Sequence, residues 1–160
     1  MPAIRNFEPD FIATLPETWH LLRTAGLALH PRVRKVRLLG SRGLAGGARP
    51  DSDIDLSLLV DVEGIGDRQE LEALLRDVLQ TTLDAWQSPI EADLAAVYDI
   101  RGCDLRCFEC DALDQAGCDG GIDCFGLYKV QKGFSGFVEN AGVDVSRILP
   151  CITIWQTGSS

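Results

Sequence analysis

The segment LGSRGLAGGARPDSDIDL, residues 39–56, contains a glycine–serine turn, a glycine-rich loop and three closely spaced aspartates, Asp51, Asp53 and Asp55. Just before it, Val36 and Leu38 share one face of residues 34–40, which predicts a strand that ends at this turn. Residues 41–52 hold three glycines and a proline, so they are predicted to form a loop. Residues 53–62 alternate between polar and apolar side chains, which predicts a second strand. The polar residues thus lie where two predicted strands meet a loop.

The aspartates of this segment have the spacing of a metal site. Asp53 and Asp55 are two residues apart on a strand, so their carboxylates project from one face about 6.5 Å apart. Two such charges repel unless a cation lies between them, and Mg²⁺ prefers oxygen ligands. Asp93, on a strand predicted over residues 90–98, could add a third carboxylate, with Glu91 on the same face as the alternative. Three carboxylates could hold two ions that clamp the attacking and leaving oxygens of a phosphoryl displacement.

Phosphate groups also have candidate partners here. Gly40 allows the backbone to approach a ligand closely, and its amide with the Ser41 hydroxyl could hold the terminal phosphates of a triphosphate. Residues 32–49 contain six cations and no acid; these are Arg32, Arg34, Lys35, Arg37, Arg42 and Arg49. Such a basic run beside a carboxylate cluster suits a phosphate ester with a divalent metal. The alternative is a solvated basic strand edge.

Taken together, Leu39–Arg42, the glycine-rich loop and Pro50–Leu56 closely resemble the signature of the DNA polymerase β-like nucleotidyltransferase superfamily, in particular its minimal nucleotidyltransferase branch. The resemblance extends over residues 15–98 and implies a small mixed sheet flanked by helices. It also implies that Gly40 and Ser41 form the nucleotide-phosphate turn, and that Asp53, Asp55 and Asp93 are catalytic carboxylates that bind Mg²⁺. The carboxylate on the acceptor side would help to deprotonate the attacking hydroxyl.

The expected reaction is transfer of a nucleoside monophosphate from a nucleoside triphosphate to a hydroxyl, with release of pyrophosphate. Small relatives of this type resemble partners of HEPN-domain proteins in toxin–antitoxin pairs, so the acceptor could lie on a protein partner. One alternative is a catalytically weak nucleotide-binding antitoxin module. Another is a metal- or redox-sensing regulator. The predicted loop is one residue longer than the usual pattern and has Leu44-Ala45 where a basic residue is common, so Arg42 and Arg49 are phosphate candidates by proximity only.

The rest of the chain predicts a single α/β domain spanning residues 1–160. A Thr14-x-x-Glu17 capping box predicts a helix over 15–29. Asp67, with Glu70 three residues on, predicts the start of a second helix. The apolar spacing of residues 128–140 predicts a third helix, and a short strand is expected near 143–148 before the tail.

A cysteine-rich insert is expected over residues 99–124. It carries Cys103, Cys107, Cys110, Cys118 and Cys124, with Cys151 apart. This spacing favours metal binding or free thiols over disulfides in a cytosolic chain. Cys107-x2-Cys110 is half of a common structural zinc arrangement, so four of the five cysteines could bind Zn²⁺. An iron–sulfur cluster and no metal at all are the alternatives.

Composition excludes several classes of protein. The 160 residues are 46% hydrophobic and 24% charged, which rules out a disordered, collagen-like or coiled-coil chain. A net charge of −9 argues against general nucleic-acid binding. No apolar run approaches the length of a membrane span, and the first residues lack the apolar core of a secretory signal, so a soluble cytoplasmic protein is expected.

Overall fold

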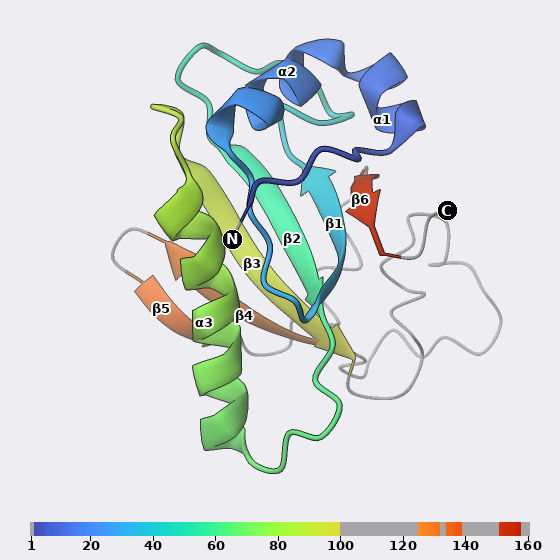
Figure 1. Ribbon diagram of the computed structural model, residues 1–160. Coiled ribbons are helices and arrows are strands. Elements are labelled where there is room, and N and C mark those ends of the chain that lie inside the picture. Colours follow the sequence, from blue (N-terminus) through green and yellow to red (C-terminus); the bar gives the residue numbers. More distant parts are fainter. Residues whose placement is uncertain (1, 100–124, 132–133, 139–150, 158–160) are drawn as a thin grey trace, which may run out of the picture.

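A computed structural model describes residues 2–99, 125–131, 134–138 and 151–157 (Figure 1). The described residues form three helices: α1 (Pro9–Thr14), α2 (Pro16–Ala25) and α3 (Arg68–Ala85). They also form six strands: β1 (Val33–Leu39), β2 (Ile54–Val60), β3 (Ala92–Asp99), β4 (Phe125–Gln131), β5 (Phe134–Val138) and β6 (Ile152–Gln156). The prediction of a mixed α/β fold is confirmed.

The six strands form one mixed sheet in the order β5-β4-β3-β2-β1-β6. Every neighbouring pair is antiparallel except β2 and β3, which run parallel. A parallel pair needs a crossover connection, and α3 provides it between these two strands. The parallel pair lies in the middle of the sheet, so equivalent ends of β2 and β3 lie side by side.

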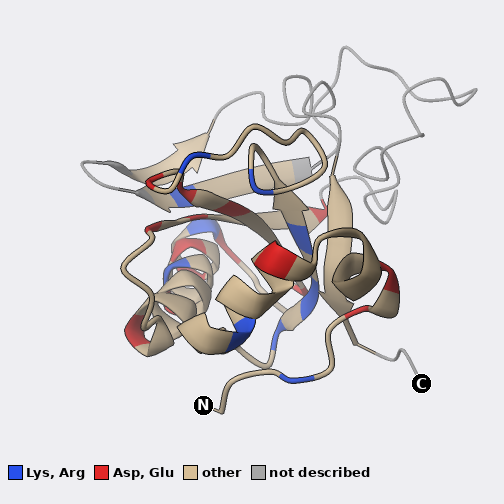
Figure 2. Cartoon of the chain, turned by 90° about the horizontal axis from the view of Figure 1, so that it is seen from above, with Lys and Arg blue, Asp and Glu red and all other residues tan. Residues whose placement is uncertain are grey.

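All three helices lie on one side of the sheet (Figures 1 and 2). Alternate residues of β2 supply the core on that side, where Ile54, Leu56 and Leu58 are buried in a cluster with residues of α3. The intervening residues of β2, among them Asp55 and Ser57, point to the opposite face because side chains alternate along a strand. None of the described helices covers that opposite face, which is where the predicted carboxylates lie.

Two helix boundaries show how local chemistry sets the fold. Asp67 caps α3 as predicted, since its side chain accepts a 2.8 Å hydrogen bond from the Glu70 amide. The predicted capping box at Thr14 is wrong: Thr14 is the last residue of α1, and no side chain caps α2. The helix predicted over 15–29 stops at Ala25 because Gly26 adopts a left-handed conformation, with φ of 77°.

The predicted helix over residues 128–140 is also wrong. Residues 125–138 instead form the antiparallel strands β4 and β5, joined by the two residues 132–133. Tyr128 is fully buried against the helix side, whereas Leu127 and Lys129 belong to the opposite face. The apolar residues match a helical spacing, but the glycines at 133 and 136 disfavour a helix, and alternation along the chain favours strands.

The C-terminal part also differs from the prediction. Residues 152–156, expected to belong to the tail, form β6 and pair with β1 at one edge of the sheet. The strand expected near 143–148 lies outside the described residues. Cys151, just before β6, is disulfide-bonded, which the preference for free or metal-bound thiols did not anticipate. The other five cysteines and almost all of the expected insert lie outside the described residues.

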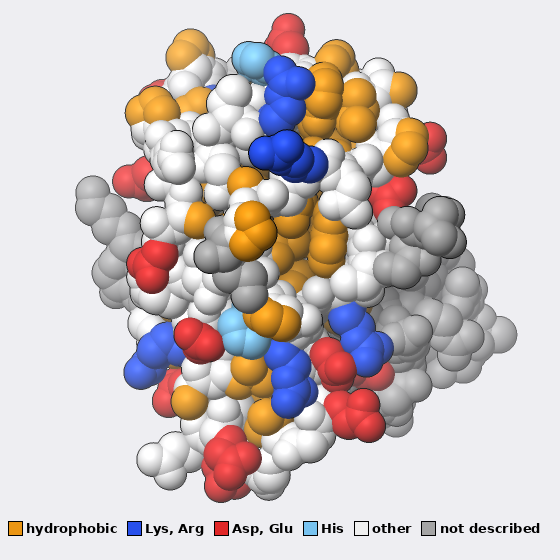
Figure 3. Space-filling view, in the orientation of Figure 1, with side chains coloured by type: hydrophobic (Ala, Val, Ile, Leu, Met, Phe, Trp, Pro, Cys, Tyr) orange, Lys and Arg blue, Asp and Glu red, His pale blue; other side chains and the backbone are white. Residues whose placement is uncertain are grey.

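Hydrophobic side chains reach the surface on the helix side of the molecule. Figure 3 shows hydrophobic side chains between the helices, with charges of both signs around them. Among the described residues, Leu44 in the glycine-rich loop is the one large hydrophobic residue that is exposed. None of the described helices combines the length and the hydropathy that crossing a membrane requires.

Candidate active site

A cavity of about 360 Å³ opens on the sheet face that the described helices leave uncovered. Strands β2, β3 and β4 and the residue after β1 contribute its polar lining, which consists of Gly40, Asp55, Ser57, Asp93 and Lys129. The remaining lining is apolar and consists of Leu39, Leu56, Ala95, Leu127 and Val138. A cavity of this size, with a few convergent polar groups on apolar walls, has the character of a small-ligand site.

Two predicted carboxylates meet in this cavity. Asp55 of β2 and Asp93 of β3 are direct partners in the parallel register, so their backbones are about 4.8 Å apart. Burial of Asp55, the charge of Asp93 and a hydrogen bond with Asp93 raise the pKa of Asp55 from 3.8 to about 6. The charge of Asp53 raises this pKa further, whereas Lys129 lowers it. Neighbouring strands therefore hold two like charges together.

Gly40 brings the end of β1 against this pair. Its φ of 75° is one that residues with a Cβ rarely adopt, and a Cβ at this position would overlap Oδ2 of Asp55. Asp55 also pairs with Leu39, the last residue of β1, across the antiparallel register. A glycine is thus required for the backbone to pass directly over the carboxylate.

Lys129 of β4 is a site residue that the sequence did not predict. Its Nζ lies 3.4 Å from each carboxylate oxygen of Asp93. Oδ1 of Asp93 is nevertheless buried without a hydrogen bond from any residue that the structure describes. The contact to Oδ1 is therefore an ion pair with poor hydrogen-bond geometry, and this oxygen keeps unused capacity to bind a cation.

The other predicted ligands lie at the margin of the cavity. Asp53 is exposed, immediately precedes β2 and is absent from the cavity lining, although its charge reaches Asp55. The side chain of Glu91 is exposed and does not line the cavity, so Asp93 and not Glu91 is placed beside Asp55. No three His, Cys, Asp or Glu side chains of the described residues are grouped as a ready metal site.

The predicted phosphate turn is divided between two cavities. Gly40 lines the carboxylate cavity, whereas Ser41 and Arg42 line a neighbouring cavity of about 430 Å³. That second cavity lies between the start of α2 and the glycine-rich loop, with Gly46 and Gly47 on its wall. Gly40 and Ser41 are adjacent, so the turn borders both spaces.

Arg42 holds the glycine-rich loop closed. Its guanidinium donates hydrogen bonds to three backbone carbonyls at the far end of the loop: Ser52 at 2.7 Å, Arg49 at 3.1 Å and Pro50 at 3.2 Å. Its own carbonyl accepts a 2.7 Å hydrogen bond from the Thr18 hydroxyl of α2. The guanidinium predicted to bind phosphate is therefore engaged within the loop.

We expect Arg42→Met to loosen this loop without unfolding the protein. Losing the three hydrogen bonds should raise the amide hydrogen-exchange rates of residues 43–49, because the guanidinium ties the two ends of this stretch together. Mass spectrometry of exchange measures the effect. Arg49→Met is the matched control, since the structure shows no partner for the Arg49 guanidinium among the described residues. Equal exchange in both variants would contradict the role given to Arg42.

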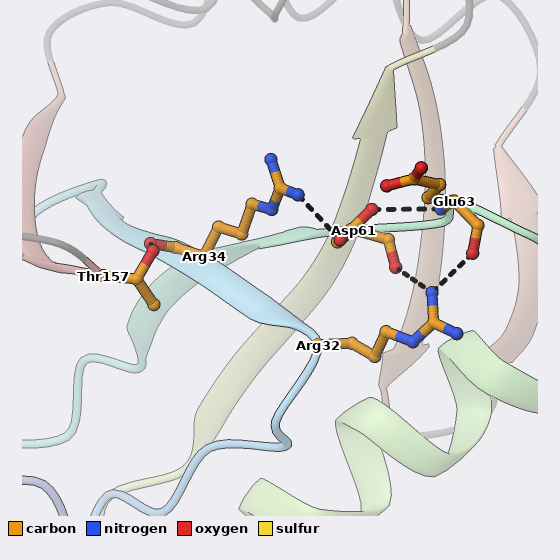
Figure 4. A network of polar contacts seen from close by, with 5 residues as sticks. All are labelled: Arg32, Arg34, Asp61, Glu63 and Thr157. Carbon is orange, nitrogen blue, oxygen red and sulfur yellow. Dashed lines mark hydrogen bonds and ion pairs between the residues drawn. The ribbon is translucent and has the colours of Figure 1, made fainter.

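A second polar cluster lies at the other end of β2 (Figure 4). Arg32 donates to the carbonyls of Asp61 and Glu63 at 3.2 and 2.7 Å, and Arg34 forms a 2.7 Å ion pair with Asp61. A hydrogen bond from the Glu63 amide, and then the interaction with Arg34, lower the pKa of Asp61. These cations of the basic run secure a turn far from the carboxylate cavity.

No protein-family model matches this chain, and comparison with curated proteins gave no match either. The interpretation of the cavity therefore depends on its own chemistry. Its donor set consists of hard carboxylate oxygens, one of them buried and unsatisfied, which suits a hard divalent cation such as Mg²⁺. Asp55 and Asp93 are already together, and Asp53 is the nearest further ligand.

The raised pKa of Asp55 makes a prediction about stability. A carboxyl whose pKa is higher in the folded protein stabilises the fold fully below its unfolded value near 3.9, and this contribution is lost as the pH rises through about 6. The ionised pair thus destabilises the metal-free protein at neutral pH. We expect Asp55→Asn to melt at a higher temperature than the wild type at pH 7.5, with the difference shrinking toward pH 4. A difference that is independent of pH would contradict the strained carboxylate pair.

Proposed function

We propose that the chain is a magnesium-dependent nucleotidyltransferase of the DNA polymerase β-like superfamily, of the minimal type. It would transfer a nucleoside monophosphate from a nucleoside triphosphate to a hydroxyl on a small molecule or a protein partner. The observation that carries the proposal is the meeting of Gly40, Asp55 and Asp93 at one cavity. The sequence motif predicts that these residues, which come from three separate strands or strand ends, act together. Their positions around one cavity support that prediction.

The donor set fits the metal that this chemistry needs. Asp53, Asp55 and Asp93 would hold Mg²⁺, which supplies charge neutralisation for the triphosphate and activates the attacking oxygen. The strain between Asp55 and Asp93 supports this assignment, because a divalent cation relieves the like-charge repulsion that raises the pKa of Asp55.

The chain's own groups have separate parts in the reaction. Gly40 lets the turn pass close to Asp55, and the Ser41 hydroxyl and backbone amides of the turn hold the terminal phosphates of the triphosphate. The acceptor oxygen attacks the α-phosphorus, the bond from the α-phosphorus to the bridging oxygen breaks, and pyrophosphate leaves. Asp93 accepts the proton of the attacking hydroxyl, since its residue lines the same cavity.

Binding of a fluorescent triphosphate with and without Mg²⁺ tests this proposal. Affinity should be at least about tenfold weaker without the metal, because the carboxylates then repel the phosphates. Asp55→Asn should reduce the dependence on metal, whereas Asp51→Asn, in the exposed loop, should retain it. Equal affinity of the wild type with Mg²⁺ and with a chelator would contradict a metal-dependent nucleotide site.

A further inference from the structure

Lys129 is an ammonium group placed among the proposed metal ligands. It lies on β4 opposite Ala95 of β3, on the sheet face that carries Asp55 and Asp93. Its side chain is 28% exposed and that of Asp93 is 22% exposed, so the pair is partly shielded from water. Nζ is equidistant from the two oxygens of Asp93, at 3.4 Å from each. The ammonium group of Lys129 therefore lies where one cation interacts with both carboxylate oxygens of Asp93.

Lys129 is also the one cation that lines the cavity among the described residues. Two acidic groups belong to the same cluster: Asp55 lies beside Asp93 in the register, and the charge of Asp53 reaches Asp55. Among the described residues that line the cavity, this lysine is therefore the group that offsets the negative charge of the cluster when no metal is bound. A divalent ion bound to Asp93 would face the ammonium at close range, and the two cations would repel each other.

We propose that Lys129 is an internal competitor of the divalent cation. It occupies Asp93 in the metal-free protein and must leave both carboxylate oxygens for a metal ion to bind there. Lys129 thereby holds Asp93 in place before loading and weakens the affinity of the site for free metal. This inference rests on the proposed function, because it requires that Asp93 is a metal ligand. The flexible four-carbon stem of lysine allows the ammonium to move aside.

Titration of the full chain with Mn²⁺, followed by the electron paramagnetic resonance signal of the free ion, tests the proposal without measuring catalysis. Lys129→Met should bind Mn²⁺ at least about tenfold more tightly than the wild type, comparable to the effect of groups that tune metal ligands. Lys129→Arg keeps the charge and should not gain affinity. If Lys129 had a purely structural role, its removal would either weaken Mn²⁺ binding or leave the affinity unchanged.

Two further variants keep the result interpretable. Arg34→Met removes a cation paired with an aspartate at the other end of the sheet, so it should leave Mn²⁺ affinity unchanged. Lys129→Gln replaces the methionine variant if that protein does not fold, as judged by circular dichroism. Equal affinity of the wild type and the neutral variants would overturn the role of Lys129 and leave the proposed function standing. Absence of Mn²⁺ binding in every variant would overturn both. Binding only in the neutral variants would support the competition.

Discussion

Asp55→Asn is expected to abolish nucleotidyl transfer while the protein stays folded. Asparagine keeps the shape of the side chain but removes the charge that would balance a magnesium ion. The loss should be at least about 100-fold, beyond the range seen when a group that merely supports a metal ligand is removed. The amide can still donate a hydrogen bond to Asp93, so the fold should be at least as stable as the wild type at neutral pH. Asp53→Asn should have a similar effect on transfer.

Asp51→Asn is the matched control for these variants. Asp51 lies in the exposed loop, two residues before Asp53, and is not part of the cavity lining. Labelled-nucleotide transfer and thermal unfolding should be measured side by side for all the variants. Retention of transfer by Asp55→Asn would remove Asp55 from the active site. Loss of transfer in Asp51→Asn would show that the assay responds to any change of charge in this segment.

Gly40→Ala is expected to lose both transfer and stability. A residue with a Cβ in the left-handed conformation costs about 1–2 kcal/mol. The added methyl group would also overlap Asp55, and overpacking of this kind costs about 1–3 kcal/mol more. The carboxylate would have to move, which would disturb its pairing with Asp93. Denaturant unfolding and the transfer assay measure the two losses.

Gly46→Ala isolates the contact with Asp55. Gly46 has a φ of 73°, close to that of Gly40, but a Cβ there would meet nothing within 4 Å. Gly46→Ala should therefore lose only the stability that a Cβ costs in the left-handed backbone conformation, and it should keep most of the transfer activity. Equal losses of stability and activity in the two alanine variants would mean that the approach of Gly40 to Asp55 has no special role.

Sequence reasoning located the parts of the site that depend on local order. Gly40 and Asp55 come from strands joined by one loop, and the alternation along each strand predicts which residues share a face. The alternation of residues 90–98 predicted the strand that carries Asp93 and Glu91, and the structure forms β3 there. Periodicity and capping thus predict the strands and the shared faces, whereas the family resemblance was needed to prefer Asp93 to Glu91.

Lys129 was missed for a physical reason. It belongs to a stretch whose apolar residues fit both a helical and a strand spacing, and the helical interpretation places it on a solvated surface. The two-residue Lys132-Gly133 link between alternating runs was the available signal of a hairpin. Which lysine faces which carboxylate depends on strand order, and the pairing of β4 with β3 joins residues far apart in the chain. Local patterns do not determine such a register.

The central claim is that this cavity transfers nucleoside monophosphates. The most direct measurement incubates the wild-type protein and Asp55→Asn with each of the four α-³²P-labelled ribonucleoside triphosphates, Mg²⁺ and a cell extract as the source of acceptors. Labelled product and released pyrophosphate are then quantified together. We predict that the wild type gives both products in equal amounts with at least one nucleotide, and that a chelator or Asp55→Asn abolishes both. Equal labelling by the wild type and Asp55→Asn, or no labelling with any of the nucleotides, would contradict the account.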